Sequence, residues 1–177
     1  MTPPHPASPP PVIVIMGVSG CGKSVVGRLL ADRLRRPFHD ADAYHPPANV
    51  EKMRAGVPLD DADRVPWLAA LAALVRAAAS AGPPIVLACS ALRRDHRRQL
   101  GLPAAGVTLV HLDGDKELIR SRIMSRTGHF MPASLLDSQW ATLERPGPDE
   151  DPLVVDVAGT PETIVDGIMK ALGDRAA

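Results

Sequence analysis

The pattern with the clearest chemical meaning is a pair of glycines with four residues between them, followed at once by a lysine and a serine. These residues are Gly17, Gly22, Lys23 and Ser24. Glycines let successive backbone N–H groups curl around a phosphate, the lysine reaches the β- and γ-phosphates of a nucleotide, and the serine hydroxyl ligates Mg²⁺. The spacing therefore favours a P-loop. The alternative is a glycine turn that binds nothing.

The flanking residues have the periodicities that a P-loop requires. A β-branched run over 12–16 predicts a buried strand, and apolar residues recur at helical spacing from Val25 to Leu34. The loop then lies at a helix N-terminus, whose partial positive charge attracts an anion. We expect the chain to bind ATP and Mg²⁺. The expected ATP contacts within the loop are Gly17, Val18, Ser19, Gly20, Cys21, Gly22, Lys23 and Ser24.

Two aspartates follow the next predicted strand. Pro37 ends the first helix, and a short strand brings Asp40 and Asp42 to the carboxyl edge of the sheet, where α/β proteins bind ligands. Since alternate strand residues share a face, both carboxylates are expected to point toward the phosphates. One would hold Mg²⁺ through water and the other would accept the proton of an attacking hydroxyl. The alternative is that Asp42 caps the next helix and Asp40 is only solvated.

The later predicted strands are followed by fewer candidate carboxylate ligands for a metal. The apolar run Ile85–Cys89 predicts a strand buried on both faces, but Ser90 follows it where many P-loop proteins place a metal-holding carboxylate. Asp40 is therefore the best candidate for that carboxylate. A rival metal site is Asp113-Gly114-Asp115, after the strand predicted at 107–112, although Asp115 is more simply interpreted as a helix N-cap.

Polar residues between 44 and 66 suit a polyhydroxylated or anionic substrate, namely His45, Asn49 and Lys52. Residues 60–64 are typical of a capped N-terminus that opens a long helix to about residue 80. Arg64 either pairs with Asp60 or contacts the substrate. Trp67 is expected to be a packing anchor rather than a stacking platform.

Arg122 and Arg126 are four residues apart and share one helix face before a break that contains glycine and proline. Such a pair is often simply exposed to solvent. An arginine on a closing lid, however, stabilises charge on a transferring phosphoryl group. We therefore predict a lid over about 122–139, with Gln139 facing the site.

Composition narrows the class of protein. The chain has 177 residues, 45% of them hydrophobic, and 20 basic residues balance 20 acidic ones. Without a broad positive field we expect no nucleic-acid or membrane partner. No apolar run approaches the roughly 20 residues of a membrane span, and no signal peptide is evident. Cys21 and Cys89 are interpreted as free thiols in a reducing, cytoplasmic compartment.

Strands that alternate with helices require a parallel sheet with right-handed crossovers. The predicted fold class is α/β, a three-layer P-loop NTPase fold with a five-stranded parallel sheet, helices on both faces and a mobile lid. Residues 1–11, with six prolines, are expected to be a disordered leader. Residues 12–177 would form one kinase domain with a substrate-binding insertion at about 44–66. A GTPase-like switch should carry an Asn-Lys-x-Asp element, which is absent, and a pure ATP binder needs neither a base nor a lid arginine.

Longer motifs make the chain similar to the gluconokinases from about Val12 to Leu172. These motifs are Gly17–Ser24, Asp40–Pro46, Asn49–Met53, Pro58–Leu68, Cys89–Leu92, Gly128–Met131 and Ser138-Gln139. The resemblance implies ATP-dependent phosphorylation of D-gluconate on its 6-hydroxyl, in gluconate catabolism that feeds the pentose phosphate or Entner–Doudoroff route. It also implies a fold like those of nucleoside monophosphate kinases and shikimate kinase, and often a homodimer.

The resemblance further implies a role for each candidate residue. The catalytic residues would be Lys23, Asp42 and Arg126. The metal would be held by Ser24 and, through water, by Asp40. Nucleotide contacts outside the loop would be Arg122 against the adenine, Arg126 on the phosphates, and Thr160 and Pro161 near the base. Contacts to gluconate would be Asp42, His45, Asn49, Lys52, Arg64, Arg97, His129 and Gln139.

Cys21 stands where a serine or another small residue is more familiar, and a thiol there would expose ATP binding to oxidation. Ala43 is a second departure, because an acidic or larger residue is more usual at this position. Two alternatives stay open. One is a kinase for a related acid such as shikimate or a ketogluconate, a choice that depends on the segment from His45 to Arg64. The other is a regulatory ATP-binding protein without turnover.

Overall fold

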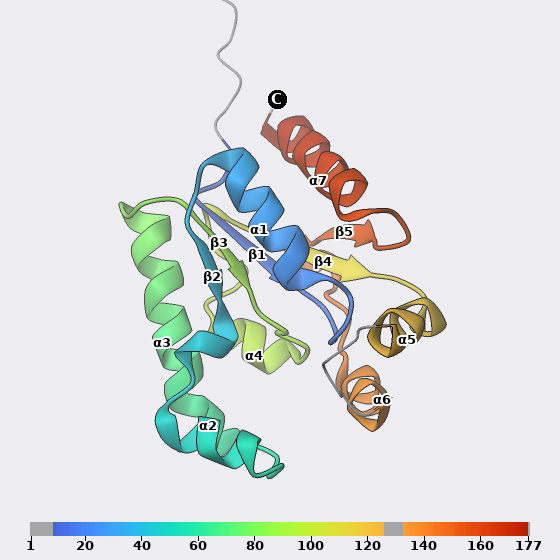
Figure 1. The fold of residues 1–177 in the computed structure, drawn as a ribbon. Helices are drawn as coiled ribbons and strands as arrows, with labels where there is room; N and C mark the ends of the chain where they lie inside the picture. The colour runs from blue at the N-terminus through green and yellow to red at the C-terminus, as the bar shows by residue number, and fades with distance from the viewer. Residues whose placement is uncertain (1–8, 126–132, 177) are drawn as a thin grey trace, which may run out of the picture.

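The computed structural model describes residues 9–125 and 133–176. Its strands form one parallel sheet in the order β2-β3-β1-β4-β5 (Figure 1). The strands are β1 (Val12–Met16), β2 (Phe38–Asp40), β3 (Ile85–Ala88), β4 (Val107–Asp113) and β5 (Leu153–Asp156). This arrangement confirms the predicted α/β class and the parallel sheet.

The helices form a layer on each face of the sheet. Two short 3₁₀ turns are η1 (Ala41–Tyr44) and η2 (Pro148–Glu150). The α-helices are α1 (Lys23–Leu34), α2 (Pro47–Arg54), α3 (Asp61–Ser80), α4 (Arg94–Gln99), α5 (Lys116–Met124), α6 (Ala133–Thr142) and α7 (Pro161–Ala176). Figure 1 shows α1 and α7 side by side over one face, while α3 covers the other. Within the described residues, no helix combines the length and apolar character needed to cross a bilayer.

The central strand β1 explains why the core has two halves. All five of its side chains are completely buried. Because successive strand residues point to opposite faces, Ile13 and Ile15 pack with α1 and α7. Val12, Val14 and Met16 pack instead with α3. A strand buried on both faces holds the P-loop that follows it firmly at the carboxyl edge of the sheet.

Capping bonds mark three helix starts, and the two at Asp60 and Asp115 were predicted above. Asp60 and Asp63 form a reciprocal capping box at the start of α3. The Thr160 hydroxyl accepts a hydrogen bond from the Thr163 N–H at the start of α7. The Asp115 carboxylate accepts hydrogen bonds from the N–H groups of two residues in α5. Capping therefore accounts for Asp115, and the rival metal site is not supported.

Two local predictions are wrong. Strand β2 ends at Asp40, and Asp42 lies in η1, so the two carboxylates do not share a strand face. The cause is local, because the Asp40 carboxylate accepts a hydrogen bond from the Asp42 N–H and turns the chain. The predicted disordered leader also extends too far. The carbonyl of Pro9 accepts a hydrogen bond from Arg36, and the carbonyl of Pro11 accepts one from Ile85.

Candidate active site

The P-loop turns back on itself between β1 and α1. Gly22 caps α1 with a φ of 101°, in the left-handed region that favours glycine. Gly20 has a φ of 84°, and a Cβ there would lie 2.4 Å from Ile123 of α5. The Lys23 ammonium donates a hydrogen bond of 2.9 Å to the Val18 carbonyl across the loop. The close packing of loop and helix leaves the phosphate-binding turn little freedom.

Ser24 and Asp40 lie together beside the loop. The Ser24 hydroxyl donates to the Asp40 carboxylate at 2.9 Å, which joins α1 to the end of β2. Hydroxyl and carboxylate oxygens are ligands that Mg²⁺ prefers. Among the described residues, no group of three or more His, Cys, Asp or Glu side chains would cage a metal alone. The pair therefore fits an ion that is held mostly by phosphate and water oxygens.

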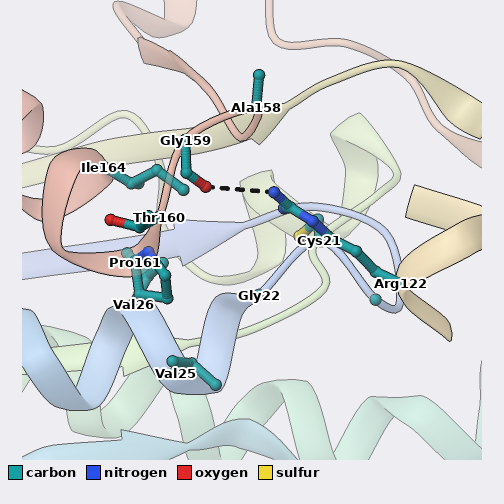
Figure 2. A pocket seen from close by; sticks show the side chains of 11 residues that line it. Cys21, Gly22, Val25, Val26, Arg122, Ala158, Gly159, Thr160, Pro161 and Ile164 are labelled. Carbon is teal, nitrogen blue, oxygen red and sulfur yellow. Dashed lines mark hydrogen bonds between the residues drawn. The ribbon is translucent and has the colours of Figure 1, made fainter. Parts of the chain in front are cut away.

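A cavity of about 550 Å³ opens on the other side of the loop (Figure 2). Its walls come from residues 20–22 of the loop, the first turn of α1, Arg122 of α5, residues 158–160 and the first turn of α7. The Arg122 guanidinium spans the cavity and donates to the Gly159 carbonyl at 3.2 Å. The fold thus brings Arg122, Thr160 and Pro161 to one mixed apolar and polar pocket, of a size that suits a nucleotide base.

Gln139 of α6 reaches the P-loop itself. Its side-chain oxygen accepts a hydrogen bond of 2.6 Å from the Ser19 N–H. Ser19 precedes the loop residues that line the base cavity. Gln139 was expected to face the site, and here it contacts the protein's own phosphate-binding backbone. Arg126 and His129, by contrast, lie outside the described residues, as does the centre of the predicted lid.

The acceptor side of the site is built on η1 and on His45, which follows it. The His45 ring stacks on the Trp67 indole, with centroids 4.5 Å apart and planes 11° from parallel. Burial lowers the pKa of His45, Arg64 lowers it further, and Asp42 opposes the shift. His45 is therefore neutral near pH 7. Trp67 is only 5% exposed and belongs to the core, which confirms the predicted packing anchor, and its partner in the stack is the protein's own His45.

Two predicted substrate contacts instead connect α2 to α3. Asn49 is only 3% exposed, and its amide donates to the Asp63 carbonyl at 2.7 Å. The Lys52 ammonium donates to both carboxylate oxygens of Asp63, at 2.6 and 2.8 Å. The prediction for Asn49 is wrong in this structure, because its side chain is enclosed. Lys52 stays partly exposed and would have to exchange Asp63 for a substrate group.

Arg64 and Arg93 converge on one carboxylate. Asp61, in the first turn of α3, accepts hydrogen bonds from Arg93 at 2.8 Å and from Arg64 at 3.4 Å. Arg64 therefore pairs with Asp61 rather than with Asp60. Arg93 was not among the predicted gluconate contacts, although an arginine just after a predicted strand, at the carboxyl edge of the sheet, could meet an anion. Together the two arginines form a cationic group that can hold a carboxylate.

Arg97 was predicted to contact the substrate, but the fold encloses its side chain within the protein. Its side chain is completely buried, and its guanidinium donates to both carboxylate oxygens of Glu150 at 2.7 and 2.9 Å. It also donates to the carbonyls of Ala91 and Leu92. A buried charge requires such partners. Arg97 therefore holds the loop after β3 in place, and no signal in the local sequence identifies Glu150 as its partner.

The thiols are protected. Cys21 and Cys89 are both buried. Burial raises the pKa of Cys21 even though Lys23 opposes the shift, and it raises the pKa of Cys89 to about 12. The thiolate is the reactive form. The sensitivity to oxidation expected from the sequence at Cys21 is therefore not supported.

Comparisons with known proteins agree with this geometry. A family model described as an AAA domain matches residues 12–146. The fold is that of a shikimate kinase from Aquifex aeolicus, with a TM-score of 0.59 at 19% identity over 93% of this chain and 98% of that one. The sheet, the P-loop and the base cavity thus define a small P-loop kinase.

Closer relatives narrow the class. A crystal structure of a gluconokinase from Sinorhizobium meliloti 1021 has a TM-score of 0.81 and 42% identity, covering 97% of this chain and 94% of that one. The gluconokinase of Gluconobacter oxydans is 47% identical over 161 residues, 91% of this chain and 90% of the relative. The thermoresistant gluconokinase of Escherichia coli is 41% identical, over 87% of this chain and 89% of the relative. The chain belongs to the gluconokinase family.

Proposed function

We propose that this protein transfers the γ-phosphoryl group of MgATP to the 6-hydroxyl of D-gluconate. The observation that supports the proposal most directly is the continuity of Asp42 with the phosphate site. The Asp42 N–H donates to Asp40, and Asp40 accepts from Ser24 of the Walker-type loop. A carboxylate for the acceptor, that of Asp42, therefore lies two residues beyond the carboxylate for the metal, that of Asp40.

The P-loop amides and Lys23 bind the β- and γ-phosphates, and Lys23 exchanges the Val18 carbonyl for a phosphate oxygen. Mg²⁺, held by Ser24 and through water by Asp40, would neutralise phosphate charge. Asp42 accepts a hydrogen bond from the 6-hydroxyl and aligns its oxygen with the γ-phosphorus. As the new O–P bond forms, the bond to the ADP oxygen breaks. Positioning and charge stabilisation account for most of the catalysis.

The acid end of the substrate requires a cation. Arg64 of α3 and Arg93 of the loop after β3 already share one carboxylate, that of Asp61. The gluconate carboxylate would take the same kind of bond, with His45 and Lys52 facing the hydroxyls. Planar guanidinium groups suit a carboxylate better than an ammonium does. The roles of Arg126 and His129 stay predictions.

The decisive experiment measures ADP release from MgATP in a coupled assay. We expect turnover with D-gluconate and little with shikimate, ketogluconates, glucose or nucleoside monophosphates. Turnover with another acid would support the kinase activity but would show that D-gluconate is not the substrate. ATP binding without turnover on any acceptor would favour a regulatory ATP-binding protein.

Two variants test the assigned roles in the same assay. Asp42→Asn should lower kcat by roughly 100-fold or more, since an amide is a poor acceptor for the hydroxyl proton. Lys23→Ala should lower both ATP affinity and kcat. Circular dichroism and the nucleotide affinity of Asp42→Asn serve as controls for folding. Near-parental turnover by Asp42→Asn would remove this residue from the mechanism.

We further infer a cytoplasmic homodimer, by analogy with the family. Light scattering after size exclusion would test the assembly. A mass of one chain, 18.8 kDa, would contradict the dimer.

A further inference from the structure

Trp67 joins α3 to η1, an element that precedes α3 in the chain and belongs to the candidate site. It lies on α3 and is only 5% exposed. Its indole N–H donates a hydrogen bond of 2.7 Å to the Ala41 carbonyl, 26 residues earlier. Ala41 stands between Asp40 and Asp42 at the start of η1. The indole thus holds the backbone from which both functional carboxylates extend.

The face of the same ring holds the other end of this segment. His45, directly after η1, stacks on Trp67 with nearly parallel planes. One side chain therefore contacts residues 41 and 45, on either side of Asp42. Buried indoles usually find a partner for their N–H, but here the partner belongs to the acceptor side of the site.

The first turn of α3, which precedes Trp67, is held by several hydrogen bonds. Asp63 lies four residues earlier on α3, and residues four apart share a helix face. Asp63 forms the capping box with Asp60, and its carboxylate also binds Lys52 of α2. The Asp63 carbonyl accepts the Asn49 amide. The first two turns of α3 thus present a fixed row that faces α2 and η1.

We propose that Trp67 is a positioning residue for phosphoryl transfer, which places the Asp42 turn through the Ala41 carbonyl and His45 through ring stacking. This inference rests on the proposed function in one respect, namely that Asp42 orients the attacking hydroxyl. The catalytic group itself is Asp42, and Trp67 acts through it.

The first test is Trp67→Phe, because phenylalanine keeps a flat face for His45 and lacks the N–H for Ala41. We expect kcat with gluconate to fall roughly 10- to 100-fold, since displacement of a reacting group by about 1 Å has such an effect. The affinity for MgATP should stay close to the parental value, because Trp67 is not among the residues that line the base cavity.

Val75→Ala is the matched control. Val75 is buried on the same helix and in the same core cluster, two turns beyond Trp67 and away from η1. It should lower the free energy of unfolding without the fall in kcat. If Trp67→Phe loses no more kcat than Val75→Ala does, or none, the proposal is overturned.

A second measurement does not depend on turnover. The chain has two tryptophans, Trp67 and Trp140, so Trp140→Phe leaves Trp67 as the sole indole emitter. A protonated imidazole quenches a stacked indole more strongly than a neutral one, so emission should fall when the pH is lowered far enough for His45 to gain its proton. Adding His45→Asn should abolish this step. The proposal would be overturned if the emission did not change with pH, or if it changed by the same amount in the chain that also carries His45→Asn.

The charged groups that face His45 shift its pKa in opposite directions. Arg64 lowers the pKa of His45 and Asp42 raises it. Adding Asp42→Asn should therefore move the midpoint of the emission change to lower pH, and an unmoved midpoint would show that Asp42 is not held near the stack. A parent chain that phosphorylates no gluconate would overturn the proposed function alone, because the fluorescence still decides the placement of Asp42 and His45.

Discussion

The side-chain oxygen of Gln139 lies 2.6 Å from the backbone nitrogen of Ser19, 120 residues earlier in the chain. A residue of α6 therefore accepts a hydrogen bond from the P-loop, the element whose N–H groups are arranged for phosphate. The contact places α6, and with it the end of the predicted lid, directly against the nucleotide site.

Gln139→Glu should weaken MgATP binding roughly 10-fold or more. The substitution puts a negative charge beside the triphosphate, and like charges 4 Å apart repel by about 1 kcal/mol in water and about 4 kcal/mol at a protein surface. Calorimetric titration with a non-hydrolysable ATP analogue would measure the loss. Ser138→Ala, an exposed neighbour, is the control. Equal affinities for Gln139→Glu and the parent would show that α6 moves away from the loop when ATP binds.

The buried pair of Arg97 and Glu150 predicts a particular pattern of stability. Arg97→Met leaves the Glu150 carboxylate buried without its partner, at a cost of about 3–5 kcal/mol. The double variant Arg97→Met/Glu150→Met should recover most of that loss, because apolar side chains often replace a buried pair without penalty. Urea unfolding would measure the free energy of unfolding of the single and the double variant.

Arg98→Met is the surface control for this cycle, since its side chain is 64% exposed. It should change the free energy of unfolding by less than about 0.5 kcal/mol. A loss in Arg97→Met no larger than this would contradict the structural role assigned to Arg97.

Both cysteines should resist modification in the folded protein. Their burial and raised pKa values keep the thiols protonated at pH 8. Ellman's reagent should therefore react slowly with the native chain and rapidly with two thiols after denaturation. Cys21→Ser should leave one reactive thiol in the denatured state. Fast native labelling of Cys21 with loss of ATP binding would restore the expectation of redox sensitivity.

Stability should fall as the solution becomes acidic. Burial lowers the pKa of His45, His96 and His111 in the folded chain. The unfolded chain therefore binds more protons as the pH falls below about 6.5, the ordinary histidine pKa. The resulting loss of stability is absent above that value, and it is complete once the pH is below the folded pKa values.

His111→Gln tests this linkage at a side chain that is only 2% exposed. Removing one titrating group should reduce the slope of unfolding free energy against pH between pH 7 and pH 5. Urea unfolding at several pH values would measure that slope for parent and variant. An unchanged slope would assign the acid sensitivity to other groups.

Much of this protein follows from neighbouring residues in the sequence. The P-loop, the buried strands and the caps at Asp60, Asp115 and Thr160 depend on spacings of a few residues, because backbone hydrogen bonds and side-chain periodicity act over that range. The order of strands and helices then implies a parallel sheet. The same local motifs carried the resemblance to the gluconokinases.

The partners of individual side chains were decided only by the tertiary structure. The resemblance implied that Arg97 contacts gluconate, but the fold encloses it against Glu150, 53 residues away. Trp67 contacts Ala41 across 26 residues, and Gln139 contacts Ser19 across 120. Local spacing does not reveal which face of a helix is covered or by what. That depends on how distant segments pack, because an enclosed polar group must find its hydrogen-bond partner wherever the fold provides one.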